Sequence, residues 1–317
     1  MDPAVKDFLQ QNDGFALIAH ISPDGDTLGS SLALCEALET MGKTVQPVCT
    51  AEVPEAYRFC PGAEKFVLPV AAKPARFVIA VDCGDLGRLG DAASLFEQAE
   101  KTLVIDHHGT NPRYGDVNWV EECGATAELI YLLLTEMDIP VTKTIAEDLY
   151  VGIASDTGNF AYSNTTERSF RIAGELLRSG YDMARVNRDL FRTQPVRKLR
   201  LQSELVRASK MSCDGKLIIG CLTNAMMDHC GATGADAEGL IDDLRDIDTV
   251  EVAIVLREEG TDTVRVSLRG KNFFDVAAIA KMFGGGGHKL AAGCTFTGTP
   301  IEEAAERLRA AVAQTLR

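Results

Sequence analysis

The sequence predicts an α/β fold in which a parallel sheet carries helices on both faces, followed by a smaller α+β domain. The first half alternates short β-branched runs with segments of helical period, as parallel sheets with crossover helices do. A strand pattern restarts after Cys213-Asp214-Gly215. The length of 317 residues suits two domains, because compact domains typically span roughly 100–200 residues.

The elements of the first half follow from these periods. Strands are expected at Phe15–Ile21, Thr44–Cys49, Phe77–Cys83 and Thr102–His107, and helices at Thr27–Met41, Asp91–Glu100, Ala125–Met137, Lys143–Ser155, Thr166–Ser179 and Met183–Phe191. The first, third and fourth strands each end in a polar cluster. Ligands of open α/β sheets bind outside the carboxyl ends of the strands, so we expect the functional site at that edge.

A basic stretch from Arg185 to Lys210 separates the two halves. We interpret it as the solvated face of a linker helix; the alternative is an electrostatic rim that gathers an anionic substrate. Beyond it, strands are expected at Lys216–Leu222, Val250–Arg257 and Val264–Leu268, and helices at Asp275–Phe283 and Ile301–Leu316, with a glycine tract and a short strand between the helices. The expected division is a first domain over 1–190, a helical linker over 191–212 and a second domain over 213–317.

Composition and charge exclude several classes of protein. No run approaches the roughly 18 apolar residues that span a bilayer, and the first residues lack a signal-peptide pattern. Nine cysteines without a C-x-x-C pair suggest neither a disulfide framework nor a thiolate zinc site, which favours a cytoplasmic location. The net charge of −14 argues against binding long duplex DNA, so a nucleic-acid substrate would be short.

Four polar motifs bring together carboxylates and imidazoles that would repel one another or stay unpaired without a cation. They contain His20, Asp24 and Asp26, then Asp82, then Asp106, His107 and His108, and finally Asp156. Oxygen and imidazole ligands without cysteine suit Mn²⁺, Mg²⁺, Fe²⁺ or Co²⁺, and zinc is a further option. Six of these residues are the candidate ligands: His20, Asp24, Asp26, Asp82, His107 and Asp156. Six ligands exceed the need of one ion with an open position, which indicates two ions about 3.5–4 Å apart that share one carboxylate.

In their order along the chain, these motifs resemble those of the DHH phosphoesterase family. Phe283-Gly-Gly-Gly-Gly287-His288 resembles the glycine-rich motif of the DHH-associated C-terminal domain. The resemblance covers essentially the whole chain and is greatest to the stand-alone nanoRNase and pAp-phosphatase (NrnA-like) branch. It implies a DHH catalytic domain over 1–190 and a substrate-binding domain over 213–317.

The resemblance also implies a role for each site residue. His20, Asp24 and Asp82 would hold the first metal, and Asp26, Asp82, His107 and Asp156 the second, with Asp82 as the bridge. Asp106 would orient an imidazole, and His108 would face the substrate phosphate. The substrate would also contact Arg269, Gly285, Gly286, Gly287 and His288. Taken without the resemblance, the glycines fit a flexible turn equally well, and Arg269 could be an exposed strand-end residue.

The implied activity is two-metal phosphodiester hydrolysis, with Mn²⁺ as the first choice of cation. The implied substrates are short RNA or DNA oligonucleotides, including linear dinucleotides such as pGpG or pApA, cleaved to 5′-mononucleotides, and 3′-phosphoadenosine 5′-phosphate (pAp). The alternatives are a cyclic-dinucleotide phosphodiesterase of the same family and a nucleotide sensor without turnover. No membrane partner is expected, and family members often pair as homodimers through the catalytic domain.

Overall fold

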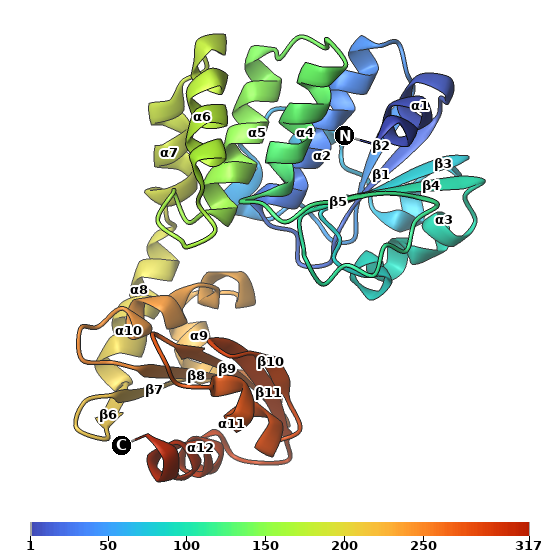
Figure 1. The fold of residues 1–317 in the computed structure, drawn as a ribbon. Coiled ribbons are helices and arrows are strands. Elements are labelled where there is room, and N and C mark those ends of the chain that lie inside the picture. The colour runs from blue at the N-terminus through green and yellow to red at the C-terminus, as the bar shows by residue number, and fades with distance from the viewer. Residues whose placement is uncertain (1, 317) are drawn as a thin grey trace. The chain divides into compact units, whose positions relative to one another are not determined.

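The computed structural model of the chain describes residues 2–316, which divide into two compact units, one ending at Thr193 and the other beginning at Gln194. Each unit has its own sheet and its own hydrophobic core (Figure 1). The predicted fold class, a helix-covered parallel sheet followed by a smaller α+β part, is confirmed.

The first unit is built on a five-stranded sheet in which every neighbouring pair is parallel. The strand order is β2-β1-β3-β4-β5. The strands are β1 (Phe15–Ala19), β2 (Val45–Cys49), β3 (Phe77–Val81), β4 (Lys101–Asp106) and β5 (Val117–Val120). Of the three interior strands, β1 and β3 are buried along their whole length, as expected for a parallel sheet covered on both faces.

Helices cover both faces of this sheet (Figure 1). The α-helices are α1 (Pro3–Gln11), α2 (Gly25–Thr40), α3 (Ala93–Glu97), α4 (Thr126–Glu136), α5 (Lys143–Asp156), α6 (Glu167–Leu176) and α7 (Met183–Phe191). Short 3₁₀ helices are η1 (Glu55–Tyr57), η2 (Ala63–Lys65), η3 (Pro69–Ala71), η4 (Leu86–Ala92) and η5 (Leu177–Ser179). Alternate residues of β1 point in opposite directions: Phe15 and Leu17 pack in the larger core with α1, α2, α4 and α5, while Ala16 and Ile18 pack with η4 and α3.

Two glycines allow α2, α4 and α5 to pack closely. A Cβ on Gly29 of α2 would lie 2.3 Å from the backbone oxygen of Asp148 in α5. A Cβ on Gly152 of α5 would lie 2.7 Å from the Cβ of Ala127 in α4. Neither position tolerates a side chain without movement of a helix, so these glycines set the distances between the helices that carry the site.

The second unit contains a six-stranded mixed sheet of order β10-β11-β9-β8-β7-β6, in which only β7 and β8 are parallel. Its strands are β6 (Lys210–Ser212), β7 (Leu217–Leu222), β8 (Val252–Glu259), β9 (Thr263–Gly270), β10 (Gly286–His288) and β11 (Ala291–Thr297). One face packs against α11 (Val276–Met282) and α12 (Ile301–Thr315), and the other against α8 (Val196–Ala208), α9 (Asn224–Cys230) and α10 (Leu240–Arg245). A short η6 (Gly234–Ala237) precedes α10.

The structure corrects several predicted elements. The helix expected over Asp91–Glu100 is wrong in extent, because α3 covers only Ala93–Glu97. It directly follows η4, whose backbone is kinked at Gly90 with φ 51° and ψ −133°. The strands expected to reach Ile21 and Cys83 end earlier, at Ala19 and Val81. The sequence prediction omitted α1, β5, β6, α9 and α10. Within residues 2–316, no helix is both long and apolar enough to cross a membrane.

Candidate metal centre

The site begins at the carboxyl ends of three adjacent strands. Ala19, Val81 and Ile105 are paired across β1, β3 and β4. The residues that follow them are His20, Asp82 and Asp106, so the polar side chains arise from one row at one edge of the sheet. Parallel strands therefore bring together residues that are more than 60 positions apart in sequence.

Asp82 occupies the middle of this edge in an unusual backbone conformation. Its φ is +60°, in the left-handed region that costs most residues energy and that Asp tolerates better than most. Its amide still donates to the carbonyl of Ile105 at 2.9 Å. The chain thus turns sharply while staying attached to β4, and the Asp82 side chain is nearly fully buried.

The first group of candidate ligands surrounds the imidazole of His20. Its Nε2 lies 3.5 Å from Oδ2 of Asp24 and 3.5 Å from Oδ2 of Asp82. Its Nδ1 lies 2.7 Å from the carbonyl of Ile21, and a proton on Nδ1 would leave the Nε2 lone pair for a cation. A guanidinium nitrogen of Arg88 is 2.9 Å from the same Nδ1.

Asp24 uses its two oxygens differently. Oδ1 accepts hydrogen bonds from the amides of Asp26 and Thr27, both at 3.1 Å, and so caps the N-terminus of α2. Oδ2 faces His20. The cap fixes the orientation of the carboxylate, which leaves Oδ2 pointing toward the candidate cation position.

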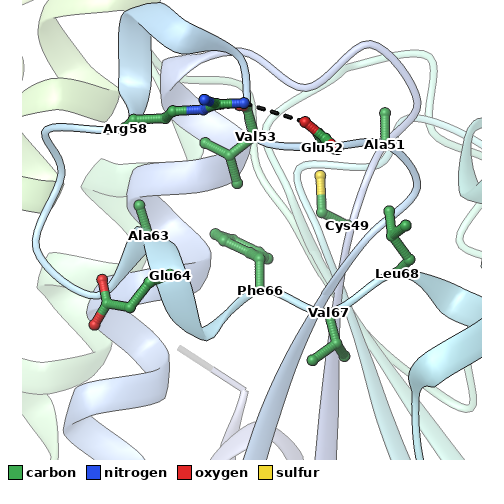
Figure 2. A pocket seen from close by; sticks show the side chains of 10 residues that line it. All are labelled: Cys49, Ala51, Glu52, Val53, Arg58, Ala63, Glu64, Phe66, Val67 and Leu68. Atoms are coloured by element: carbon green, nitrogen blue, oxygen red, sulfur yellow. Dashed lines mark hydrogen bonds and ion pairs between the residues drawn. The ribbon is translucent and has the colours of Figure 1, made fainter.

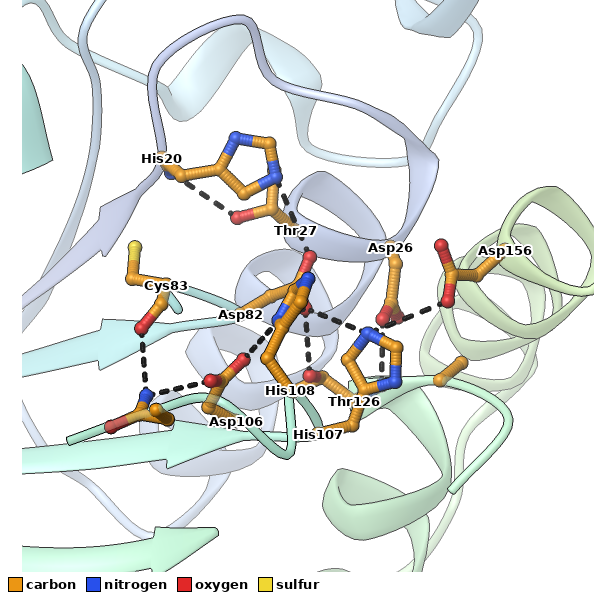
Figure 3. A network of polar contacts seen from close by, with 12 residues as sticks. His20, Asp26, Thr27, Asp82, Cys83, Asp106, His107, His108, Thr126 and Asp156 are labelled. Atoms are coloured by element: carbon orange, nitrogen blue, oxygen red, sulfur yellow. Dashed lines mark hydrogen bonds and ion pairs between the residues drawn. The ribbon is translucent and has the colours of Figure 1, made fainter. Parts of the chain in front are cut away.

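The second group surrounds His107. Its Nε2 lies 3.5 Å from Oδ1 of Asp82 and 3.4 Å from Oδ2 of Asp156, and its Nδ1 is 3.1 Å from the carbonyl of Cys123 (Figure 3). Asp156 is the last residue of α5. The contact with Cys123 favours a proton on Nδ1 and again leaves Nε2 free to bind a cation.

Asp26 is completely buried and connects two helices. Oδ2 accepts from the amide of Thr126 at 2.6 Å, and Oδ1 accepts from the amide of Ala127 at 2.9 Å and from the hydroxyl of Ser30 at 3.1 Å. Helix α4 has no side-chain cap of its own at Ala125. Asp26 therefore caps α4 from α2, where the partial positive charge of the helix N-terminus favours a carboxylate.

Thr126 is a site residue that the sequence reasoning missed. Its hydroxyl donates to Oδ1 of Asp82 at 2.9 Å, in addition to the amide contact with Asp26. The side chain is fully buried. A threonine at the start of a helix is common, so only the topology reveals that this one joins carboxylates from β3 and α2.

Asp106 and His108 form a pair beside these ligands. Oδ1 of Asp106 lies 2.7 Å from Nδ1 of His108, and Oδ2 accepts from the side-chain amide of Asn111 at 2.6 Å (Figure 3). The hydrogen bond with Asp106 raises the pKa of His108. Burial raises the pKa of Asp106, but its bonds to His108 and Asn111 outweigh burial and lower it. His108 therefore presents an imidazole that tends to stay protonated, with 44% of its side chain exposed.

The raised pKa values of two carboxyl groups, Asp26 and Asp156, indicate that the site lacks positive charge. Burial, with repulsion from Asp82, Asp156 and Asp24, raises the pKa of Asp26 well above its usual value. Burial also raises the pKa of Asp156 to about 6, with Asp82 contributing and His107 opposing. A divalent cation would remove this repulsion, so the donor set fits a cation site.

The distances fit the same conclusion. Three overlapping sets of donors each lie within 4.8 Å of one another: His20, Asp24 and Asp82; Asp26, His107 and Asp156; and Asp82, His107 and His108. The Nε2-to-oxygen separations of 3.4–3.5 Å exceed those of charged hydrogen bonds. Two ligands that each lie about 2.1 Å from one ion are roughly 3 to 3.5 Å apart. The structure thus brings all six predicted ligands into one cluster.

Comparison with known proteins decides the family. A "Bifunctional oligoribonuclease and PAP phosphatase NrnA" from Thermus thermophilus is 34% identical over 318 residues, covering 98% of this chain and 93% of that protein. The N-terminal domain of the DHH family matches residues 15–153. This chain belongs to the DHH family. The predictions of a DHH phosphoesterase and of a metal-dependent hydrolase are thereby confirmed.

Further comparisons extend the DHH assignment over the whole chain. The DHHA1 domain matches residues 214–317. A protein of the same name as the Thermus relative, from Bacillus subtilis, is 28% identical and covers 89% of this chain and 89% of its own length. The crystal structure of an exopolyphosphatase-related protein from Bacteroides fragilis superposes with a TM-score of 0.90 at 26% identity, covering 99% of this chain and 96% of the other.

The DHHA1 domain contains the residues expected to contact substrate. Arg269 on β9 pairs with Ala291 on β11, which pairs in turn with His288 on β10. Paired residues of adjacent strands project from the same face, so Arg269 and His288 share one face of this sheet. Nε of Arg269 is also 3.7 Å from Oδ1 of Asp242.

The glycine tract of the DHHA1 domain is partly a strand, because Gly286–His288 forms β10. A Cβ on Gly285 would lie 2.1 Å from the carbonyl oxygen of Gly293, and one on Gly287 would lie 2.5 Å from that of Ala291. These two glycines are required by the close approach of β10 and β11. A Cβ on Gly286 would contact nothing within 4 Å, so the fold does not explain that glycine.

Several basic side chains of this stretch form ion pairs or hydrogen bonds within the chain. Arg185 forms an ion pair with Glu147, and Arg197 bonds both oxygens of Asp236, at 3.1 and 2.9 Å. Lys198 donates to the carbonyl of Glu238. Helix α8, which carries much of this stretch, lies in the second unit and buries Leu201 and Leu205 in its core. These contacts favour a structural role over an electrostatic rim.

A pocket of about 330 Å³ lies near the end of β2 (Figure 2). Its lining is mainly apolar, and an ion pair of 3.1 Å between Arg58 and Glu52 lies at its side. The lining residues are Cys49, Ala51, Glu52, Val53, Arg58, Ala63, Glu64, Phe66, Val67 and Leu68, none of which is a predicted site residue.

Proposed function

We propose that this chain hydrolyses short oligonucleotides and linear dinucleotides to 5′-mononucleotides and removes the 3′-phosphate of pAp. The observation that carries the proposal is the position of Asp82, whose two oxygens face His20 and His107, one in each group of donors. A carboxylate shared in this way suits a pair of cations. Relatives named bifunctional oligoribonuclease and PAP phosphatase support the choice of substrates.

The proposed ligands divide between two cation positions. His20, Asp24 and Asp82 would hold one ion, and Asp26, Asp82, His107 and Asp156 the other. Mn²⁺ is the proposed ion, because its preference for oxygen and imidazole donors matches this set. When bound, the two cations supply Lewis acidity toward the phosphoryl oxygens and lower the pKa of a water molecule that attacks phosphorus.

The chain's own residues then orient and neutralise the substrate. His108, kept protonated by Asp106, donates a hydrogen bond to a phosphoryl oxygen and balances the charge that develops there. Asn111 donates to the other oxygen of Asp106 and fixes its orientation. Asp82 is thus proposed to hold the cations, and Asp106 to position the imidazole of His108.

Substrate binding is proposed to involve the DHHA1 domain. Arg269 and His288 share one face of its sheet, and Gly286 has no packing reason to be glycine. Glycine permits close approach of a ligand to the backbone, which supports contact of this tract with a phosphate or terminal nucleotide. Replacing Gly286 by Ala should leave the unfolding free energy nearly unchanged and raise KM.

The remaining assignments follow from charge and chemistry. The net charge of −14 disfavours a long polyanionic substrate, which supports substrates of a few nucleotides. All nine cysteines are free thiols, which supports a reducing cytoplasm as the place of action. The proposed division is a catalytic domain over 1–190, a helical linker over 191–212 and a substrate-binding domain over 213–317.

The test is a substrate panel after removal of metal by a chelator. Purified protein would be offered pApA, pGpG, longer oligoribonucleotides, pAp and cyclic dinucleotides, with and without Mn²⁺. We expect Mn²⁺-dependent release of mononucleotides from the dinucleotides and of phosphate from pAp. Preferential cleavage of cyclic dinucleotides would favour the cyclic phosphodiesterase, and binding without turnover would favour a sensor. The variant Asp82→Asn would be assayed with the same panel. Its matched control is Asp91→Asn, which changes an exposed carboxylate.

A further inference from the structure

The loop after Asp156 is held rigidly beside the metal centre. It spans residues 157–165, between α5 and α6 (Figure 1). The side-chain amide of Asn164 donates to the carbonyl of Asp156 at 3.1 Å and to that of Gly124 at 3.0 Å. Gly124 lies in the segment that leads into α4, and Asp156 is a proposed ligand. The end of the loop is therefore tied to two segments of the site.

The loop backbone is strained at its centre. Gly158, Asn159 and Phe160 have φ values of 56°, 55° and 64°, three successive residues in the left-handed region. Non-glycine residues in this region are costly and persist only where the surroundings hold them, most often at functional sites. Phe160 supplies that hold, because its ring stacks on Phe170 at 5.0 Å and packs at 6.2 Å from Tyr150.

This conformation presents the ring of Tyr162 in a defined way. A Cβ on Gly158 would lie 2.5–2.6 Å from Cζ, Cε1 and Cε2 of Tyr162. A point almost equidistant from three ring carbons lies on the axis through the ring centre, so Gly158 is under the face of the ring and not at its edge. Tyr162 is nevertheless 55% exposed. One face of the ring rests on glycine backbone, while more than half of the residue is exposed to solvent.

An exposed aromatic ring that is already held in place can bind a ligand with little further cost of ordering. The partner that suits it is a flat apolar ring. Aromatic platforms beside phosphate-binding sites stack nucleobases without reading their hydrogen-bonding edges. The single tryptophan cannot have this role, since Trp119 is buried in the core.

We propose that Tyr162 stacks the nucleobase of the nucleotide whose phosphate lies at the metal centre. This inference rests on the proposed function and adds to it a base-binding residue in the first unit. Stacking without edge contacts accepts every base, with purines bound more strongly because their rings are larger. Loss of one such stack weakens binding roughly 10- to 100-fold.

The experiment compares ligands with and without a base. The inhibition constants of adenosine 5′-monophosphate and of ribose 5-phosphate would be measured against pApA hydrolysis in the Mn²⁺-loaded protein, for wild type, Tyr162→Phe and Tyr162→Leu. Tyr162→Phe keeps the ring and serves as the conservative control. Mn²⁺ affinity and the unfolding midpoint would be measured for each variant. Among residues 2–316 no hydrogen bond or ion pair joins the Tyr162 side chain to a proposed ligand, so neither value should change.

The expected result is that wild type and Tyr162→Phe bind the nucleotide more tightly than ribose 5-phosphate. In Tyr162→Leu that preference should fall at least 10-fold, while the inhibition constant of ribose 5-phosphate stays within about twofold. An unchanged preference in Tyr162→Leu, or equal weakening of both ligands, would overturn the inference. A wild-type protein that fails to hydrolyse pApA at all would instead contradict the proposed function.

Discussion

The hydroxyl of Thr126 donates a 2.9 Å hydrogen bond to Oδ1 of Asp82, while its amide donates to Oδ2 of Asp26 at 2.6 Å. One buried residue at the first turn of α4 therefore positions carboxylates from β3 and from α2. Both carboxylates are proposed metal ligands, and both bring negative charge to the same small volume. Their separation depends on a residue that itself binds no metal.

Replacing Thr126 by Val should weaken Mn²⁺ binding about 10-fold or more, because the shape is kept but the hydrogen bond to Asp82 is lost. Thr126→Ser should retain near wild-type affinity. Calorimetric titration of the metal-free variants measures both, and Thr135→Val, an exposed position on the same helix, is the control. Equal affinities for the Val and Ser variants would show that the hydroxyl has no positioning role.

Metal affinity should rise with pH between about 5.5 and 9. In the metal-free protein, burial lowers the pKa of His20, but hydrogen bonds and charge from Asp24 and Asp82 outweigh it and raise the pKa to about 9. The pKa of Asp156 is raised to about 6. Both protons occupy lone pairs that a cation needs, so binding releases them and higher pH favours binding. Competition with a chelating dye across this pH range measures the Mn²⁺ affinity. Calorimetric titration in buffers of different ionisation enthalpy measures the number of protons released. An affinity that does not depend on pH would contradict this prediction.

Asp106→Asn should lower the pKa of His108, because the hydrogen bond from Asp106 is the main cause of its upward shift. The imidazolium then loses its proton at lower pH, so the alkaline limb of the kcat profile should move to lower pH. Turnover at pH 8 should fall roughly 10-fold or more. In a His108→Ala background the same change should have little further effect, since the two residues act as one unit. Additive losses in the double variant would separate their roles.

Gly152→Ala should damage the site as well as the fold. The added Cβ would lie 2.8 Å from Oδ1 of Asp26 and 2.7 Å from the Cβ of Ala127. Such overpacking costs about 1–3 kcal/mol of unfolding free energy, and here it would also displace a proposed ligand. Gly174→Ala, where a Cβ meets nothing within 4 Å, should instead be neutral or stabilising. Denaturant unfolding and Mn²⁺ titration of both variants provide the comparison.

The sequence predicts the site residues best where a polar residue follows directly after a strand pattern. His20, Asp82 and Asp106 could be placed at strand ends because a buried β-branched run precedes each of them. Strand β5 was missed because it has only four residues and alternates buried with half-buried positions. Helix α1 was missed although Asp2 at its N-cap and Pro3 at its first position are typical of a helix start. The helix predicted over Asp91–Glu100 was too long, because only Ala93–Glu97 is α-helical and a 3₁₀ helix kinked at Gly90 precedes it.

Residues that act through the fold could not be predicted from local sequence. Thr126 bonds Asp82, which is 44 positions earlier, and Asn164 bonds Gly124, which is 40 positions earlier. Neither contact leaves a pattern in the neighbouring residues. The aromatic platform of Tyr162 likewise depends on its ring lying over Gly158, which follows from three left-handed residues in succession.

The most direct test of the central claim is anomalous diffraction at the manganese edge from crystals grown with Mn²⁺, for wild type and Asp82→Ala. The account predicts two peaks flanking Asp82 in the wild type, one near His20 and Asp24 and the other near Asp26, His107 and Asp156. Asp82→Ala should lose density at both positions and should retain under a tenth of wild-type hydrolysis of pApA. A wild-type map without ions in this cluster, or an Asp82→Ala protein of near-normal activity, would contradict it.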